Sequence, residues 1–263
     1  MSTEAGIRYA LDDRGVARVI IDRPDRMNAV DAAAERALIG IWEAIEGDAR
    51  VRCVILTGAG ERAFSTGADM KSEGGKSGLE YWAAERPGGF GGIALRDTLD
   101  VPVIARVNGH ALGGGMEMVL GCDIVIAARH ATFGLPEPRV GRLALDGGIA
   151  LLPRRIPHVW ATGLLLTGRR IAAEEALRLG LVNEVVEAAQ LDDAVQRWVD
   201  DVLACAPLSL RAIKQMVRNG AALSAKEAQQ LRLPALIAAL TSADQEEGVR
   251  AFREKRPPRW TGR

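Results

Sequence analysis

The sequence predicts an α/β protein in which helices cover a sheet of mainly parallel strands. Three observations carry this prediction. Short apolar runs and helical patterns alternate in the order strand, helix, strand, helix, strand, helix, strand. The runs are apolar at nearly every position, as is typical of strands that are covered on both faces. From about residue 146 onward, amphipathic helical patterns dominate.

Composition and charge narrow the classes of function. The 263 residues are 48% hydrophobic and 26% charged, which suits one large globular domain or one domain with a small appendage. Lys plus Arg and Asp plus Glu are both 34 and aromatic residues are 4%, so nucleic-acid binding is disfavoured. Three scattered cysteines, no signal-like N-terminus and no membrane-length apolar run predict a cytoplasmic protein without membrane contact.

The first half of the chain supplies the predicted strands. Two strands flank a turn in IRYALDDRGVARVIID, and later strands are expected at VRCVIL, VPVIARV and DIVIAA. Asp31 is placed to cap a helix with apolar residues at helical spacing: Ala34, Leu38, Ile41, Trp42 and Ile45. A loop, TGAGERAFSTGADM, follows VRCVIL. Residues 71–92 mix glycine, charge and aromatics and predict a mobile surface segment or lid.

The final third predicts successive amphipathic helices. Their segments are LDDAVQRWVDDVLACA, PLSLRAIKQMVRNG, ALSAKEAQQLRLPALIAAL and the tail SADQEEGVRAFREKRPPRW. The last of these helices is expected to begin at a Ser242 cap and to end at Pro257. We therefore divide the chain into a domain at residues 1–200 and a helical region at residues 201–263.

Three consecutive glycines, Gly113, Gly114 and Gly115, separate a predicted strand from an apolar helix pattern in VNGHALGGGMEMVLGC. A helix N-terminus presents unpaired N–H groups, and glycine lets a ligand atom approach them closely. This favours a site for an anion, or for an oxygen that becomes anionic during a reaction. The alternative is that the glycines only let the helix pack tightly on a neighbouring strand. A second glycine-containing loop, AFSTGADM, also follows a buried strand and favours two N–H groups aimed at one oxygen.

Two acids belong to the same part of the sequence. Glu117 falls on the first turn of the helix that the glycines begin, and Glu137 stands between Pro136 and Pro138 in FGLPEPRVG. Two carboxyls in an apolar pocket are suited to act as general acid and base. Taken singly, each has a simpler interpretation, because Glu117 complements the helix dipole and Glu137 fits a surface loop.

The ordered motifs RPDRMNA, AFSTGAD, PVIARVNGHALGGGMEMVLGCDIVIAA, FGLPEPRVG, LLLTGRRIAAEEALRLGLVNEVV and EEGVRAFREKRPP span nearly the whole chain. Together they resemble the crotonase family, also called the enoyl-CoA hydratase/isomerase superfamily. The resemblance implies a crotonase-type ββα spiral, here residues 1–200, that binds an acyl-CoA thioester. It also implies a C-terminal helical region, residues 201–263, that builds a homotrimer or a dimer of trimers. No separate cofactor is expected, since coenzyme A is part of the substrate, and scattered histidines predict no metal ion.

The resemblance also assigns catalytic roles. The oxyanion-hole donors of the family map onto the backbone N–H groups of Ala68 and Gly114. Both positions that hold a water molecule in the family's hydratases are glutamate here, Glu117 and Glu137. This favours a carbon–oxygen lyase that hydrates a 2-enoyl-CoA to a 3-hydroxyacyl-CoA with syn geometry, or catalyses the reverse dehydration. In this hypothesis Glu117 deprotonates the water, Glu137 protonates the α-carbon, and both share the water's hydrogen bonds.

Further positions are implied for substrate and CoA binding: Arg26, Met27, Ala29, Ala68, Asp69, Met70, Gly113, Gly114, Pro136, Leu145, Phe252 and Lys255. Phe252 and Lys255 are expected to reach the CoA site of a neighbouring subunit, and the alternative for this tail is a solvated basic helix end. After Glu137 the sequence departs from typical hydratases, because Arg142, Leu145 and Asp146 bring charge and bulk toward the acyl pocket. This stretch is similar to the carnitinyl-CoA dehydratase and cyclic-enoyl-CoA hydratase branches. The alternative for Asp146 is a helix cap.

Rival interpretations remain at this stage. Gly58-x-Gly60-x-x-Ala63 follows a strand and superficially fits a dinucleotide-binding fingerprint, which would make the protein an oxidoreductase. Within the family, the alternatives are an enoyl-CoA isomerase, an acyl-CoA hydrolase and a decarboxylase. A homologue without catalytic activity, serving as an RNA-binding or scaffold protein, is a further alternative, which the balanced charge and the two glutamates oppose.

Overall fold

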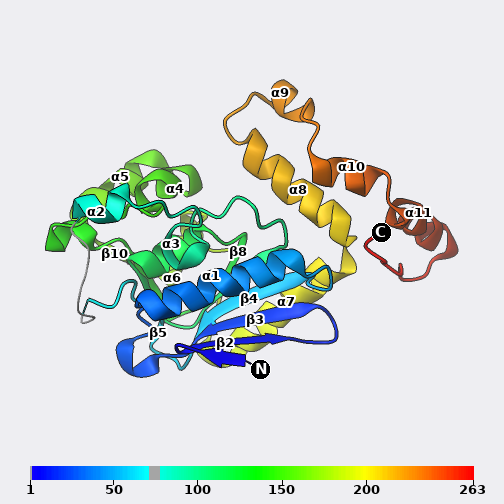
Figure 1. Ribbon diagram of the computed structural model, residues 1–263. Helices are drawn as coiled ribbons and strands as arrows, with labels where there is room; N and C mark the ends of the chain where they lie inside the picture. The colour runs from blue at the N-terminus through cyan, green and yellow to red at the C-terminus, as the bar shows by residue number, and fades with distance from the viewer. Residues whose placement is uncertain (1, 71–77) are drawn as a thin grey trace.

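Two sheets form the centre of the protein in the computed structural model, which describes residues 2–70 and 78–263 (Figure 1). The larger sheet has the strand order β1-β2-β3-β4-β6-β8-β11, and the smaller sheet has the order β10-β9-β7-β5. The strands are β1 Ser2–Glu4, β2 Ile7–Leu11, β3 Val16–Ile21, β4 Cys53–Gly58, β5 Ala63–Ser65, β6 Val103–Val107, β7 His110–Leu112, β8 Ile124–Ala128, β9 Thr132–Gly134, β10 Arg170–Ala172 and β11 Glu184–Val186.

The middle of the chain forms a spiral that gives one strand to each sheet in turn. The strands β4, β6 and β8 are parallel neighbours in the larger sheet, while β5, β7 and β9 are parallel neighbours in the smaller one. The predicted strands and the ββα arrangement are therefore confirmed. Part of the loop predicted after VRCVIL is instead the strand β5. Three residues are too few to show a strand pattern, and β5 forms because β7 pairs with it.

Helices cover both faces of the larger sheet. The helices of the described residues are α1 Ala32–Gly47, α2 Gly78–Ala83, α3 Gly114–Leu120, α4 Gly148–Arg155, α5 His158–Thr167, α6 Ala173–Arg178, α7 Leu191–Ala204, α8 Pro207–Gly220, α9 Ala225–Gln229, α10 Pro234–Leu240 and α11 Ala243–Glu254. Single 3₁₀ turns are η1 Pro24–Arg26, η2 Phe90–Gly92, η3 Glu137–Val140 and η4 Ala188–Gln190. Within the described residues, no helix is both long and apolar enough to span a membrane.

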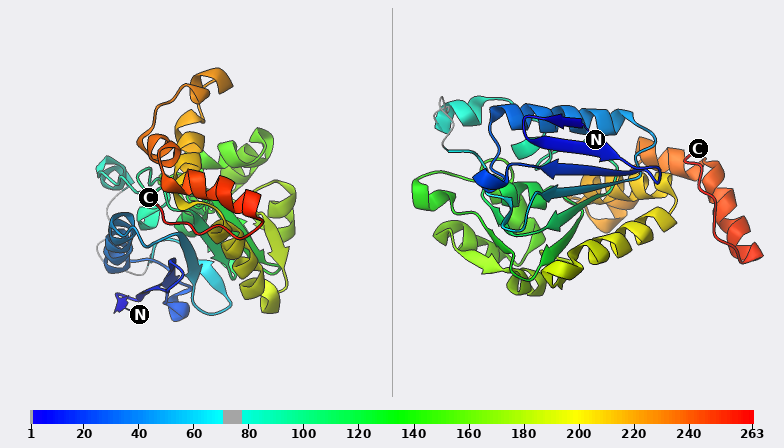
Figure 2. Two further views of the ribbon diagram at one scale, coloured as in Figure 1. Left: turned by 90° about the vertical axis from the view of Figure 1, so that its right-hand side faces the viewer. Right: turned by 90° about the horizontal axis from the view of Figure 1, so that it is seen from below.

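The core follows from the alternation of side chains along the strands. In β4, Val54 and Leu56 belong to the apolar cluster that includes α1, whereas Cys53 and Ile55 belong to the cluster that includes α7. Figure 2 shows α1 and α7 on opposite faces of the sheet. The side chain of Asp31 accepts hydrogen bonds from the first backbone N–H groups of α1, so the predicted cap is confirmed. Burial on both faces explains why the predicted strands are apolar throughout.

The segment at residues 71–92 differs from the prediction. Residues 71–77 lie outside the described residues, and α2 follows them. The end of the segment is buried, which contradicts a surface location there. Phe90 is 5% exposed, and the carbonyl of Gly91 accepts a hydrogen bond of 2.8 Å from the indole of Trp42. Glycines in this stretch therefore allow close packing against α1.

The C-terminal helices extend away from the sheets (Figures 1 and 2). The boundary predicted after residue 200 falls inside α7, which packs on the sheet as far as Val202. One long helix was expected over ALSAKEAQQLRLPALIAAL, but this expectation is wrong: the chain forms α9 and α10 with a break before Pro234. Proline lacks the N–H that a continuing helix needs and restricts Leu233 to extended backbone, here φ −85° and ψ 147°.

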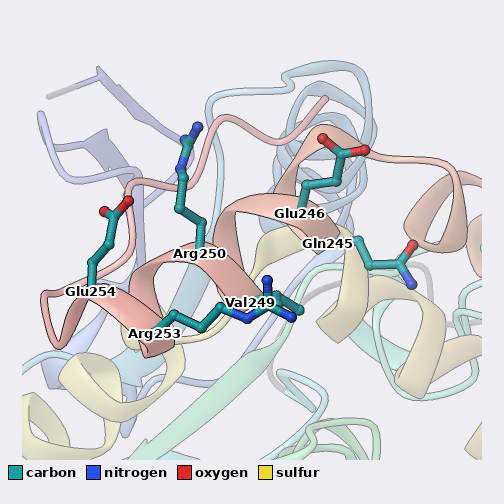
Figure 3. Close-up of a pocket in the computed structure, with 6 residues that line it drawn as sticks. All are labelled: Gln245, Glu246, Val249, Arg250, Arg253 and Glu254. Atoms are coloured by element: carbon teal, nitrogen blue, oxygen red, sulfur yellow. The ribbon is translucent and has the colours of Figure 1, made fainter.

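The last helix, α11, begins after Ser242 as predicted, but the hydroxyl of Ser242 donates to the carbonyl of Ala239 and does not cap the helix. The helix ends before Pro257, because Lys255 adopts a left-handed conformation with φ 53°. A shallow hollow lies along this helix (Figure 3), and its lining residues are Gln245, Glu246, Val249, Arg250, Arg253 and Glu254.

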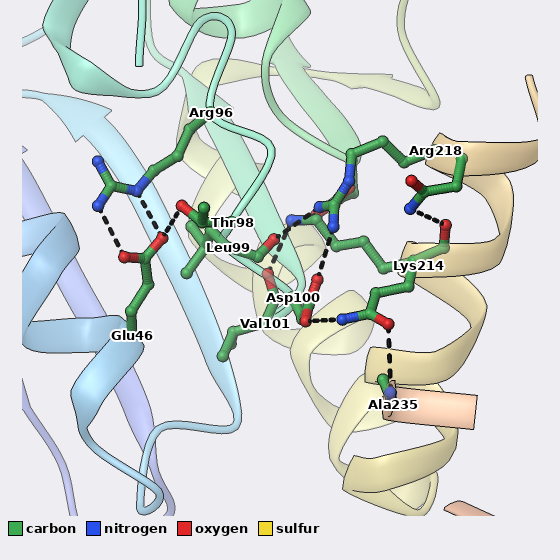
Figure 4. Close-up of polar contacts among 12 residues, drawn as sticks. Glu46, Arg96, Thr98, Leu99, Asp100, Val101, Lys214, Arg218 and Ala235 are labelled. Atoms are coloured by element: carbon green, nitrogen blue, oxygen red, sulfur yellow. Dashed lines mark hydrogen bonds and ion pairs between the residues drawn. The ribbon is translucent and has the colours of Figure 1, made fainter. Parts of the chain in front are cut away.

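Polar contacts attach α8 to the end of the sheet (Figure 4). Lys214 donates to the carbonyl of Val101 at 2.8 Å and to Asp123 at 2.7 Å. Arg218 donates to Asp100 at 2.9 Å, and the Asp100 carboxylate also accepts from Gln215. These charge-assisted contacts fix the direction in which the helical region leaves the sheet.

Candidate active site

Three neighbouring strands of the smaller sheet deliver predicted site residues to one edge. Ala68 follows β5, Gly114 follows β7 and Glu137 follows β9, each within three residues of the strand end. Because these strands are parallel, their carboxyl ends lie at the same edge, about 4.8 Å apart from strand to strand. The spiral thus brings together residues that lie nearly 70 positions apart in the sequence.

The glycines at the start of α3 have identifiable structural causes. Gly113 has φ +56°, and an added Cβ would lie 3.0 Å from Oε1 of Glu137. A Cβ on Gly114 would lie 2.6 Å from carbons of the Phe90 ring, and one on Gly115 would lie 2.1 Å from the carbonyl oxygen of Ser65. Tight packing, the alternative weighed from the sequence, therefore accounts for Gly114 and Gly115. The same close packing places the N-terminus of α3 against β5 and Phe90.

The peptide before Ala68 lies against the start of α3. A Cβ on Gly67 would be 2.8 Å from the backbone nitrogen of Gly114. Ala68 forms a parallel bridge with Val30, in which the carbonyl of Gly67 and the N–H of Asp69 make the hydrogen bonds. In such a bridge the N–H of the middle residue faces the opposite side. The N–H of Ala68 is therefore directed away from Val30, beside the N-terminus of α3.

Glu117 lies on the first turn of α3 and is only 3% exposed. Its Oε1 accepts a hydrogen bond of 2.9 Å from the backbone N–H of Gly148, at the start of α4. The pKa of Glu117 is raised to about 8, chiefly by burial and also by the nearby carboxylates of Asp146 and Glu137, although backbone hydrogen bonds from Gly148 and Asp146 oppose the shift. Glu117 therefore holds a proton at pH 7.

Glu137 opens the turn η3, and its charge is one of those that raise the pKa of Glu117. Burial raises the pKa of Glu137 as well. Its Oε1 lies against Gly113, while its Oε2 is buried without a hydrogen-bond partner among the described residues. A buried carboxylate oxygen normally has a partner, so this atom has an unused capacity to bind a polar group of a ligand or a water molecule. The expectation of a simple surface loop charge for Glu137 does not fit this burial.

The predicted CoA-binding loop lies beside the loop that carries Ala68. The carbonyl of Met27 accepts a hydrogen bond of 3.2 Å from the N–H of Thr66. Arg23 joins the two loops, because its guanidinium contacts both Asp31 and Asp69. Of the positions implied for CoA binding, Arg26 and Met70 are exposed, Met27 is half-buried and Ala29 is buried.

Asp146 does not cap a helix, contrary to the simpler interpretation of this residue. The helix α4 begins after Gly147 without a side-chain cap. Asp146 is instead 6% exposed, accepts a hydrogen bond from the hydroxyl of Tyr81 and lies 3.3 Å from Nε of Arg86. Arg86 also pairs with Glu35 of α1, and its guanidinium lies over the Tyr81 ring at 4.4 Å. The neighbouring Leu145, like Pro136, is half-buried.

Sequence reasoning missed Tyr81, Arg86 and Glu35. The only signal was the mixture of charge and aromatic residues in the segment 71–92, and no spacing connected that segment with Asp146 or with Glu35 on α1.

Two predicted residues lie elsewhere. Phe252 lies in α11 and Lys255 directly follows this helix, which extends away from the two sheets (Figures 1 and 2), so within one chain they do not join Glu117 and Glu137. Phe252 is 86% exposed. A role for these two residues at a CoA site therefore requires a neighbouring subunit.

The dinucleotide-binding alternative is contradicted by the fold. Its fingerprint requires a helix directly after the glycines, but Ala63 begins the strand β5. Gly58 has a packing cause, since a Cβ there would lie 2.2 Å from the carbonyl oxygen of Phe64.

The two-sheet ββα spiral is that of the crotonase-fold enzymes. The model of the enoyl-CoA hydratase/isomerase family matches residues 12–263, and the chain belongs to this family. It is 39% identical over 260 residues to carnitinyl-CoA dehydratase of Proteus mirabilis (strain HI4320), a match that covers 96% of this chain and 98% of that protein. It is 37% identical over 254 residues to carnitinyl-CoA dehydratase of Escherichia coli (strain K12), with 94% and 95% covered.

Solved structures agree with this family. Enoyl-CoA hydratase from Mycobacterium tuberculosis H37Rv is 36% identical with a TM-score of 0.88, covering 98% of this chain and 99% of that one. Enoyl-CoA hydratase from Bacillus anthracis is 34% identical with a TM-score of 0.90, covering 98% and 100%. The chain is therefore an enzyme of the hydratase and dehydratase type, a carbon–oxygen lyase.

Proposed function

We propose that the protein catalyses the reversible syn hydration of a 2-enoyl-CoA thioester to a 3-hydroxyacyl-CoA, with Glu117 and Glu137 as the reacting pair. The observation that carries this proposal is that the buried carboxyl of Glu117 and the half-buried carboxyl of Glu137 both lie beside the N-terminus of α3. Relatives named carnitinyl-CoA dehydratase, with about the same length, support a reaction in which water leaves or joins an acyl-CoA.

In the proposed mechanism the thioester carbonyl accepts hydrogen bonds from the N–H groups of Ala68 and Gly114. These donors stabilise the enolate oxygen that forms when water adds to the β-carbon. Removal of one such donor typically lowers the rate by about 10²–10³-fold. The partial positive charge at the start of α3 acts on the same oxygen.

The two carboxyls complete the proton balance. One carboxylate takes a proton from the water as the water oxygen bonds to the β-carbon, and the other carboxyl, in its acid form, gives a proton to the α-carbon. The pair thus needs one proton in total. In the unliganded protein burial places a proton on Glu117, because its pKa is raised to about 8. If Glu117 is the base, as the resemblance implies, this proton passes to Glu137 when water and substrate bind, so that Glu117 can accept a proton from the water and Glu137 can give one to the α-carbon.

The test follows loss of the conjugated-thioester absorbance with crotonyl-CoA, cinnamoyl-CoA, cyclohexenecarboxyl-CoA and the enoyl-CoA formed by dehydration of carnitinyl-CoA. Hydration of one of these should fall by at least about 10²-fold in Glu117→Gln and equally in Glu137→Gln, because each acid transfers a proton. Loss in only one variant would indicate an isomerase. Absorbance loss that is matched by release of free CoA would indicate a hydrolase, because thioester cleavage also removes the conjugated-thioester chromophore.

We also propose that copies of the chain associate through the C-terminal helices as a trimer or a dimer of trimers. Apolar side chains of α8, α10 and α11 are exposed in the single chain, among them Val217 at 70% and Leu240 at 59%. Exposed apolar surface of this kind is typical of an interface between subunits. Sedimentation equilibrium tests this proposal, and a monomer at micromolar concentration would contradict it.

A further inference from the structure

Asp146 occupies a position that links the acid Glu117 to a distant part of the chain. On one side, the chain runs from Asp146 through Gly147 to Gly148, whose N–H donates to Oε1 of Glu117 at 2.9 Å. On the other side, the carboxylate of Asp146 contacts Tyr81 of α2 and Arg86 of the loop that follows. The Asp146 side chain is 8% exposed, so these contacts are well shielded from water.

The backbone from Asp146 to Gly148 has little room to move. Gly147 has φ +122°, and an added Cβ would lie about 3 Å from the side chains of Leu151 and Leu95. A Cβ on Gly89 would lie 3.1 Å from the carbonyl oxygen of Asp146, so the loop after Arg86 also packs on this turn. A displacement of Asp146 therefore has to move Gly148, two residues later, and the hydrogen bond to Glu117 with it.

Negative charges outnumber positive charges around Asp146. The groups that face Asp146 are Tyr81 from α2, Arg86 from the following loop and, beyond Arg86, Glu35 from α1. Arg86 is shared between two carboxylates, so one negative charge remains uncompensated within this group. The carboxylates whose charges act on Glu117 are those of Asp146 and Glu137. Asp146 therefore affects Glu117 both through the backbone and through its charge.

We propose that Asp146, held by Tyr81 and Arg86, is a positioning residue that sets the orientation and protonation of Glu117. This inference rests on the proposed function, in which Glu117 transfers a proton, and adds residues that the glutamate pair depends on. Asp146 itself does not touch the reacting atoms. Its effect on the reaction passes through the N–H of Gly148 and through the electric field at Glu117.

The test compares Asp146→Asn and Tyr81→Phe with the unmodified protein, and Asp200→Asn serves as a control. Asp200 is an exposed acid that pairs with Arg14 at 2.5 Å on the surface. Carbon-13 NMR follows the titration of the Glu117 carboxyl, which needs no catalytic activity. We expect the midpoint to move to lower pH by about half a unit or more in Asp146→Asn, because a nearby negative charge is lost. The control should leave the midpoint unchanged.

Kinetics supply the second measurement. Hydration by the unmodified protein tests the proposed function independently of the variants. Relative to it, we expect kcat to fall about 10–100-fold in Asp146→Asn and less in Tyr81→Phe, with KM changed less than threefold. The double variant should be no slower than Asp146→Asn alone, because both changes break the same link. An unchanged Glu117 midpoint together with an unchanged kcat, or fully additive losses, would overturn the proposal. If Asp146→Asn fails to fold, Tyr81→Phe alone decides by the same measurements.

Discussion

Replacement of Gly114 by alanine tests the packing at the start of α3 and the proposed oxyanion donor at once. The added methyl group would lie 2.6 Å from three carbons of the Phe90 ring, whereas carbon atoms in contact normally stay 3.5–4.0 Å apart. An overlap of about 1 Å therefore has to be relieved. Phe90 is 5% exposed and cannot simply rotate into water, so the start of α3 has to shift.

The expected cost follows from this overlap. Overpacking of a well-filled core typically destabilises a protein by about 1–3 kcal/mol, and we expect a loss of this size in urea-induced unfolding. The shift also misplaces the N–H of Gly114, so kcat for hydration should fall by about 10²-fold. Gly40→Ala is the matched control, because an added Cβ there has no atom within 4 Å. In the interior of α1 this control should stabilise the protein by up to about 1 kcal/mol.

A second substitution distinguishes packing from the donor itself. Phe90→Leu in the Gly114→Ala background removes ring atoms that overlap the new methyl group, so at least tenfold of the lost kcat should return. Gly114→Ala with a kcat within twofold of the unmodified protein, despite a loss of stability, would refute the placement of the donor at this N–H.

Two further predictions concern charge and the C-terminal helices. Between the ordinary value of 4.5 and about 8, the folded state binds a proton at Glu117 that the unfolded state releases, so stability falls as pH rises through this window. Glu117→Gln removes this loss of stability. In urea unfolding, the free energy of unfolding of the variant relative to that of the unmodified protein should therefore rise from pH 4.5 to pH 8 by roughly 3–5 kcal/mol. Parallel pH profiles for the two proteins would contradict the raised pKa. Asp100→Ala leaves Arg218 and Gln215 of α8 without their shared acceptor, so amide hydrogen exchange in α8 should accelerate by about tenfold, corresponding to roughly 1–2 kcal/mol. Asp13→Ala is the control, because Asp13 is an exposed acid in the turn between β2 and β3, and equal exchange in both variants would argue against the attachment shown in Figure 4.

Patterns within short stretches of sequence predicted much of the fold, because many strands and helices are determined by their own residues. The strands at VRCVIL, VPVIARV and DIVIAA are apolar on both faces, and Asp31 precedes a helical pattern, so each element carried its own signal. The strand β5 did not, since it depends on pairing with β7. The break before Pro234 did have a local signal, the proline itself, and a single helix over that stretch ignored it.

Some residues of the candidate site were predictable from the sequence, and some of its contacts were not. Gly114 and Glu137 stand beside strand ends, and Glu117 lies three positions after Gly114, so sequence order alone placed them near one another. The contacts of Asp146 were not predictable, because Tyr81 precedes it by 65 positions and no repeating pattern joins them. Only the spiral, which returns the chain to the same edge on each turn, brings these side chains into contact.

The order of strands in the smaller sheet has a consequence for how such an enzyme can change. The proposed donors at Ala68 and Gly114 follow adjacent hydrogen-bonded strands, so backbone pairing and not any side chain brings the two loops together. The proposed acyl end of the site is built differently, from side chains of loops such as that of Leu145. Substitutions in these loops can therefore alter which acyl group is accepted, while the two proposed donors keep their relative positions. The pairing of β5 with β7 thus keeps the proposed oxyanion donors constant, while the loops beyond the strands are free to vary.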